Sequence, residues 1–193
     1  MRGALVVPPD EGISVGKPVT DSLPVLSFLS PVRGDACFLA PDEVRTGREA
    51  VRYLAKQGHR RILHLTYSRE ATGIRDRLRG YEEAMRTIGE IPRVLRDVDA
   101  QTLSSALNRH QPTALFCHND PLALLTIRLL AEIGHRVPKD VSVLGVDSSP
   151  TFRWLQPDLT TMAYPREALA QAAVARILGS KKSHRIPACR IVE

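Results

Sequence analysis

Aromatic residues are scarce in this chain: Phe, Trp and Tyr make up 5% of its 193 residues, and Trp occurs once. Long hydrophobic runs are lacking too, since none approaches the roughly 20 residues that a membrane-spanning helix needs. The opening "MRGALVVPPDEG" becomes polar too soon for a secretory signal. With a hydrophobic content of 43%, the sequence predicts a globular, cytoplasmic protein with no membrane partner.

Cysteine is also rare, and Cys37, Cys117 and Cys189 lie far apart, without the spacing of a disulfide framework or a zinc site. We therefore predict no metal. The motifs of common cofactors and nucleophiles are absent as well: no strand is followed by GxGxxG, and neither GxxxxGKS/T nor GxSxG occurs. These absences predict no cofactor and no catalytic residue.

The net charge of +6 raises the question of a nucleic-acid surface. Lys and Arg are mixed with carboxylates along the chain, however, and gather only in "GSKKSHR" at residues 179–185. A run of this kind is more often a solvated loop than a nucleic-acid site. The chain itself is not expected to read DNA.

What the sequence does contain is an alternation of short β-rich runs with amphipathic helical stretches, which is typical of parallel α/β folds. "VSVLGVD" is apolar enough for the centre of a parallel sheet. Strands are expected near 4–9, 23–29, 36–40, 60–67, 93–98, 113–117, 141–147 and 185–193, and helices near 42–57, 74–88, 102–109, 121–133 and 166–178.

Polar residues end two of these strands. The segment "FCHNDPLAL" places Asn119 and Asp120 after one strand, and Asp147 ends another. Because crossover connections make the strands of a parallel sheet point the same way, these residues gather at one edge, where open α/β sheets bind ligands. Amide and carboxylate groups suit a hydroxyl-rich or amine-bearing small molecule.

Local structural roles compete with this interpretation. Asp120 can cap the helix that Pro121 begins, and Asp147 can stabilise the turn "SSP" that follows it. Neither role gives Asn119 or His118 a structural task. The convergence of polar side chains on one edge therefore favours the ligand hypothesis.

Four ordered blocks then carry a family resemblance: "VRYLAKQGHRRILHLT", "RDRLRGYEEAM", "PTALFCHNDPLALLTIRLLAEIGHRVPKDVSVLGVD" and "PDLTTMAYPREALAQAAVARIL". They resemble the sensor domain of the lactose-repressor/galactose-repressor (LacI/GalR) family of bacterial transcription regulators, over roughly residues 47–193 and more loosely 1–46. The resemblance implies a periplasmic-binding-protein-like α/β fold with two parallel-sheet, Rossmann-like lobes, the first of them incomplete. It also implies a small effector in the cleft between the lobes.

The resemblance further implies residues for that cleft. Arg77 of "RLRGY" matches the family's effector-binding arginine, Asn119 of "HND" the amide, and Asp147 of "LGVD" the carboxylate that holds ligand hydroxyls. Phe38 and Tyr164 fall on the segments that cross between the lobes, where the family places pocket-lining side chains. The implied effector is small and polar, either a sugar or a nucleoside-like molecule.

By the same resemblance, the N-terminal lobe comprises residues 1–47 and 162–179, and the C-terminal lobe comprises residues 48–161 and 180–193. The family's helix-turn-helix DNA-binding domain is not expected in this chain, so contact with operator DNA is implied only through a missing N-terminal domain. The expected assembly is a homodimer. The resulting hypothesis is an effector-sensing and dimerisation domain of a transcription regulator, whose ligand shifts the orientation of the lobes.

Two alternatives stay open at this point. A free-standing periplasmic-type sugar-binding protein shares the fold. An α/β enzyme would instead use Asp120 or Asp147 as an acid or base.

Overall fold

The computed structural model describes residues 3–7, 23, 25–29, 31, 37–150, 159–179 and 186–192. Its strands are β1 (Ala4–Val6), β2 (Val25–Phe28), β3 (Cys37–Leu39), β4 (Ile62–Thr66), β5 (Arg93–Arg96), β6 (Ala114–Cys117), β7 (Ser142–Asp147), β8 (Thr161–Ala163) and β9 (Arg190–Val192). Its helices are α2 (Glu43–Lys56), α3 (Thr72–Thr87), α4 (Ala100–His110), α5 (Asp120–Glu132) and α7 (Arg166–Ile177).

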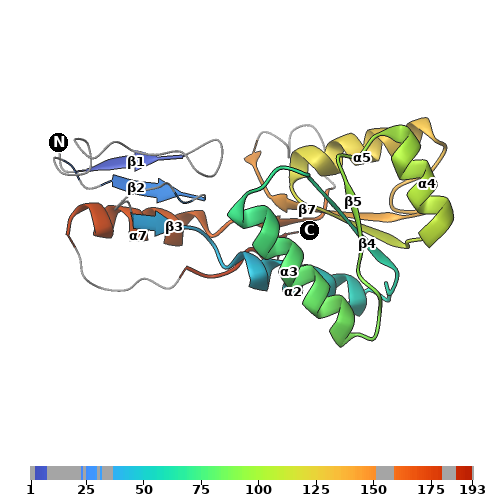
Figure 1. Ribbon diagram of the computed structural model, residues 1–193, viewed down its shortest axis with the longest axis horizontal. Coiled ribbons are helices and arrows are strands. Elements are labelled where there is room, and N and C mark those ends of the chain that lie inside the picture. Colours follow the sequence, from blue (N-terminus) through green and yellow to red (C-terminus); the bar gives the residue numbers. More distant parts are fainter. Residues whose placement is uncertain are drawn as a thin grey trace.

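Two sheets organise these elements (Figure 1). The first is parallel and has the order β1-β2-β3, and the second has the order β5-β4-β6-β7-β8-β9. Every pair of the second sheet is parallel except β8 with β9. The parallel α/β architecture predicted from the sequence is confirmed.

Side chains along the strands of the second sheet point alternately into two hydrophobic cores, one on each face of the sheet. Ile62 of β4 and Phe116 of β6 pack in the core that α2 and α3 cover, whereas Leu63 and Leu115 pack in the core that α4 and α5 cover. Successive side chains of a strand point to opposite faces, so a sheet buried on both faces needs apolar residues at nearly every position. Burial on both sides holds the strands firmly, and their carboxyl ends meet at one edge.

The first sheet lies to one side of this larger body, together with α7, which contacts β2 and β3 (Figure 1). In the described part of the chain, the backbone crosses between the two units from β3 to α2 and from β8 to α7. The predicted lobe boundaries fall inside α2, between residues 47 and 48, and inside β8, between residues 161 and 162. The division of the chain at these residues stays a prediction. Residues 8–9 of the predicted first strand and most of "GSKKSHR" lie outside the described residues.

Candidate functional site

A cavity of about 460 Å³ lies where the carboxyl ends of β4, β6 and β7 approach the first sheet. Val7 and Leu29, which follow β1 and β2, line it from the side of that sheet. This is the edge at which ligands bind in open α/β sheets. Four of the predicted site residues line the cavity: Arg77, Asn119, Asp147 and Tyr164.

The fifth predicted residue, Phe38, is not brought to the cavity. It lies on β3, its side chain is 36% exposed, and it is not part of the cavity lining. A position on a crossing segment therefore did not suffice to place the ring at the site.

Arg77 takes part in a buried ion pair. Its side chain is 1% exposed, and its Nη2 and Nε donate to Oε2 of Glu43 at 2.7 and 2.9 Å. The pair depends on a close approach of α2 and α3 at two glycines. A Cβ at Gly47 would overlap the backbone of Arg77, and a Cβ at Gly80 would overlap the backbone of Val44. Glycine at both positions therefore lets Glu43 reach Arg77.

Three further hydrogen bonds extend this ion pair into a network. Nη2 of Arg77 donates to the hydroxyl of Tyr164 at 2.9 Å, and Nη1 donates to the carbonyl oxygen of His118. The Tyr164 hydroxyl donates in turn to Oε1 of Glu43 at 3.1 Å, and burial raises the pKa of Tyr164. The network joins the start of α2, the helix α3, the end of β6 and the segment after β8.

Glu43 is a cavity residue that the sequence did not identify. The available signal was an acidic residue in the first turn of a helix, which a favourable interaction with the helix dipole already explains. Its pairing with Arg77 arises only when the two helices pack.

Asn119, and not Asp120, is the N-cap of α5, so the prediction that Asp120 caps this helix is wrong. The side-chain oxygen of Asn119 accepts hydrogen bonds from the Leu122 amide at 3.0 Å and from the Tyr67 hydroxyl at 2.9 Å. Its side-chain nitrogen has no hydrogen-bond partner among the described residues. Asn119 therefore caps a helix with one atom and offers a donor at the cavity with the other.

Asp120 has a different structural task. Its side chain is 1% exposed, accepts a hydrogen bond from the Thr161 hydroxyl at 2.5 Å, and is hydrogen-bonded by the amides of Ser148 and Ser149. A Cβ at Gly145 would overlap this carboxylate, so the glycine in β7 makes room for it. Asp120 thus holds the turn that follows β7.

The carboxylate of Asp147 takes no part in these hydrogen bonds. Within the part of the chain that the structure describes, its half-buried carboxylate has no hydrogen-bond partner. Burial raises its pKa to about 7. Its backbone has φ 123°, and Ser148 has φ 49°, conformations that non-glycine residues rarely adopt and that are frequent at ligand sites. Because Asp120 binds the amides of the turn, the turn-cap role predicted for Asp147 as an alternative belongs to Asp120.

The arrangement does not form a His–Asp acid–base pair. Burial holds the pKa of His118 well below its usual value, and its ring contacts Tyr67 edge-on while Nδ1 lies 3.5 Å from Nη1 of Arg77. Asp120 directs its carboxylate to Thr161 instead. His118 is therefore a neutral, buried neighbour of the arginine.

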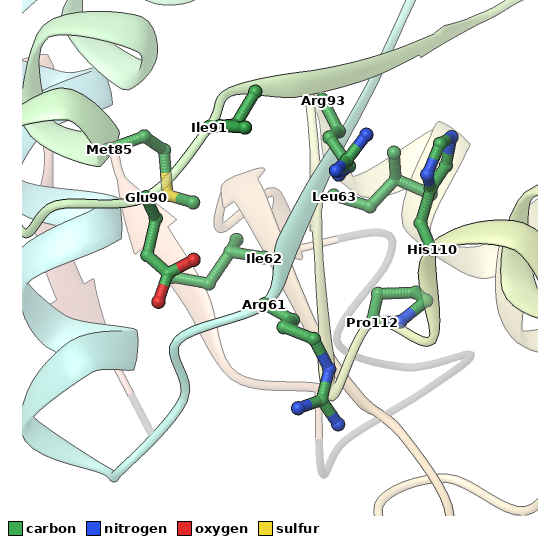
Figure 2. A pocket seen from close by; sticks show the side chains of 9 residues that line it. All are labelled: Arg61, Ile62, Leu63, Met85, Glu90, Ile91, Arg93, His110 and Pro112. Atoms are coloured by element: carbon green, nitrogen blue, oxygen red, sulfur yellow. The ribbon is translucent and has the colours of Figure 1, made fainter.

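A second cavity, of about 130 Å³, lies at the opposite edge of the sheet (Figure 2). Arg61 precedes β4, Arg93 begins β5, and Figure 2 shows Arg93 beside His110. Nε of Arg61 already donates to the carbonyl oxygen of Gln111 at 2.6 Å. This cavity is less than a third of the size of the first, and we do not assign it a ligand.

Within the described ranges, no cluster of three or more His, Cys, Asp or Glu side chains is placed to hold a metal ion. The helices in that part of the chain also lack the combined length and apolar character needed to cross a bilayer.

Comparison with known proteins adds to this geometry. The family model of the periplasmic binding protein-like domain matches residues 51–193. The chain belongs to this family. Among its relatives in the family, it is 37% identical over 141 residues to the HTH-type transcriptional repressor PurR of Yersinia enterocolitica serotype O:8 / biotype 1B, covering 68% of this chain and 41% of PurR. It is 30% identical over 154 residues to the repressor CytR of Escherichia coli strain K12, covering 75% of this chain and 45% of CytR.

The chain thus spans less than half of the length of these two relatives. Among solved structures, a LacI transcriptional regulator from a Rhodococcus species is similar with a TM-score of 0.79 and 26% identity, over 100% of this chain and 76% of that chain. A putative ribose operon repressor from Burkholderia thailandensis has a TM-score of 0.79 at 23% identity, over 100% and 77%, which shows the fold alone. The resemblance to LacI-type regulators and the periplasmic-binding-protein-like fold are confirmed, and the relatives are repressors rather than enzymes.

Proposed function

We propose that this chain senses a small polar effector as part of a LacI/GalR-type transcription regulator and performs no catalysis. One observation carries the proposal: Asn119 and Asp147 line the same cavity, and each presents a polar group that no described residue satisfies. An amide donor and a carboxylate acceptor that line one cavity suit a molecule with several hydroxyl or amino groups. Arg77 lines the same cavity, and its buried ion pair with Glu43 holds its guanidinium group in place.

The regulatory mechanism we propose is a population shift. The cavity is lined from both sheets, so a ligand that contacts both favours one relative orientation of the two units. The effect on the equilibrium can be no larger than the difference in the ligand's affinity for the two orientations. The relatives are named HTH-type repressors, which supports a role in which this shift controls operator binding by a cytoplasmic homodimer.

The proposal is tested with the Asp147→Ala variant. Loss of charge-assisted hydrogen bonds of about 1.5 to 3 kcal/mol lowers the affinity for the effector roughly tenfold or more. Isothermal titration calorimetry of this chain against monosaccharides, nucleosides and nucleobases measures it. Asp140→Ala is the matched control, because Asp140 pairs with Arg136 at the surface, away from the cavity.

Two results would contradict the proposal. One is the absence of saturable binding by every compound of the panel. The other is an unchanged affinity in Asp147→Ala together with a lower melting temperature, because that combination assigns the residue a purely structural role.

A further inference from the structure

The guanidinium group of Arg77 lines the cavity, but its N–H donors are already used. Nε and Nη2 donate to Oε2 of Glu43 at 2.9 and 2.7 Å, and Nη2 also donates to the Tyr164 hydroxyl at 2.9 Å. Nη1 donates to the carbonyl oxygen of His118, and it lies 3.5 Å from Nδ1 of the same, neutral residue. Every N–H of the guanidinium group thus has an acceptor within the protein.

The start of α2 does not explain why Glu43 turns inward. Asp42 is the N-cap, and its carboxylate accepts a hydrogen bond from the Arg45 amide at 2.9 Å. An acidic side chain in the first turn interacts favourably with the helix dipole while it stays in solvent. The side chain of Glu43 is nevertheless only 6% exposed, with Oε2 bound to Arg77 and Oε1 to Tyr164. The pairing with Arg77 therefore directs this carboxylate.

Stability alone gives a weak reason for the buried ion pair. Desolvation of two buried charges offsets much of their attraction, and apolar side chains of similar size often replace such a pair without loss. A second ion pair, Arg48 with Glu83, already joins α2 to α3 at the surface, with side chains 44% and 38% exposed. The pair of Arg77 and Glu43 differs from it in one respect, because both of its residues line the cavity.

A carboxylate against a guanidinium group is also the arrangement by which an arginine binds an acidic ligand. Glu43 provides that carboxylate from within the chain, and the close crossing of α2 and α3 at Gly47 and Gly80 holds it there. An acid from solution must compete with this intramolecular group, whose effective concentration is high. Displacing Glu43 would also leave its own charge without a partner beside the cavity.

We infer that Glu43 is the specificity-determining residue of this cavity: it fills the place at Arg77 that an acidic group of a ligand would take. Arg77 holds Glu43 and makes no hydrogen bond to the effector. Recognition is left to Asn119 and Asp147, which suit hydroxyl and amino groups. This inference rests on the proposed function and specifies its ligand class, a molecule with no acidic group at the α3 side of the cavity.

Chemical rescue of the Glu43→Ala variant tests the assignment, with acetate as the probe. The substitution removes a carboxylate and the carbon that bears it, a group with the size and shape of acetate, and leaves Arg77 without its charged partner. We expect the melting temperature of this variant to rise by several degrees when acetate replaces chloride at constant ionic strength, because a ligand that binds only the folded chain stabilises it. The wild-type chain should show no comparable rise, since Glu43 fills the place.

Two further variants control this experiment. Glu83→Ala is the matched control, because Glu83 also pairs with an arginine across α2 and α3 but lies at the surface. It measures the general effect of acetate on stability. The double variant Glu43→Ala/Arg77→Met removes both charges of the buried pair and should lose the response to acetate. A rise of equal size in Glu83→Ala or in the double variant would overturn the inference. A Glu43→Ala variant that stays unfolded in both salts would do the same, because the place then admits no external carboxylate.

A second measurement uses the unmodified chain. The Nε–H proton of Arg77, assigned from its loss in Arg77→Lys, should exchange slowly with solvent and keep its NMR chemical shift when acetate is added. Slow exchange is expected because the group is buried and bound to Glu43. A chemical shift that changes with acetate and saturates would mean that an external acid displaces Glu43, and the inference would be wrong.

The outcomes separate this inference from the proposed function. A response to acetate that depends on Arg77, in a chain that binds no compound of the calorimetric panel, supports the role of Glu43 and removes the support for the proposed function. Conversely, effector binding that is lost in Asp147→Ala, without a response to acetate in Glu43→Ala, overturns the role of Glu43 and leaves the proposed function standing.

Discussion

Two carboxylates meet at the end of β7, and they have different tasks. Asp120 binds Thr161 and the amides of the turn, whereas the carboxylate of Asp147 accepts no hydrogen bond from the described residues. The positive φ angles of Asp147 and Ser148 cost conformational energy for residues other than glycine. The hydrogen bonds of Asp120 to the turn offset that cost. Asp120 is therefore a positioning residue for Asp147.

Replacing Asp120 with Ala tests this role. The buried donors that it satisfies are left without a partner, so the free energy of unfolding should fall by about 1.5 to 3 kcal/mol, measured by urea denaturation. The affinity for an effector should also fall, because the turn no longer holds Asp147. Thr161→Val is the control, since it removes one hydrogen bond and leaves the turn amides satisfied. An affinity that stays at the wild-type value in folded Asp120→Ala would reduce Asp120 to a stabilising residue.

The raised pKa of Asp147 makes a prediction about pH. Burial lifts this pKa from its ordinary value of 3.8 to about 7, opposed by the charge of Arg77 and reinforced by those of Asp120 and Glu43. The native chain then holds a proton that the unfolded chain releases, so this residue makes the protein less stable as pH rises from about 4 to 7. Urea denaturation across that window should show a smaller decline in Asp147→Asn than in the wild type. The titrating histidines are common to both proteins and cancel in the difference.

At the scale of single residues, the sequence predicted the polar groups that end strands. Asn119 and Asp147 were found because a polar residue after an apolar strand has a known place in a parallel sheet. The capping assignment failed because Asn119 and Asp120 are both good caps, and the choice depends on Thr161, which is distant in sequence. Glu43 was missed for the same reason, since its partner Arg77 is on another helix.

At the scale of elements, the close crossing of α2 and α3 sets the geometry of the ion pair. Gly80→Ala should therefore do more than change helix propensity. The added methyl group would overlap the backbone of Val44 and push the helices apart, at a cost that exceeds the roughly 1 kcal/mol gained from replacing glycine in a helix. We expect a melting temperature lower by several degrees. Gly73→Ala is the matched comparison, since Gly73 also lies in α3 and the nearest atom to a Cβ there is Oε1 of Glu43 at 3.9 Å.

The elements themselves were largely predictable, and their contacts were not. Apolar periodicity predicted the bounds of α3 and β7 to within about two residues, because α3 buries one face and β7 is buried on both. Gly47 and Gly80 gave no such signal, because a glycine inside a helix only lowers helix propensity when the sequence is taken alone. Their role becomes visible when the facing backbone is known.

At the scale of the whole molecule, one buried network touches both segments through which the chain crosses between the two units. Glu43 begins the helix after the first crossing, Tyr164 follows β8 at the second, and Arg77 binds both. Buried polar networks of this kind give a structure a discrete arrangement, because partial satisfaction is costly. The same three residues line the adjoining cavity. The network is therefore positioned to respond to the ligand and to set the orientation of the units.

Tyr164→Phe tests this coupling without removing a charge. It deletes two hydrogen bonds that tie the second crossing to Arg77 and Glu43, so the distribution of distances between the two units should broaden. Spin labels at Val174 on α7 and Gln101 on α4, both exposed, report that distribution after replacement of the native cysteines.

The control is Tyr81→Phe, which deletes hydrogen bonds to Ile62 and Arg93 within one core. It should lower stability by a similar amount, about 1 to 2 kcal/mol, and leave the distances unchanged. Equal broadening in both variants would trace the effect to general destabilisation and not to the crossing segments.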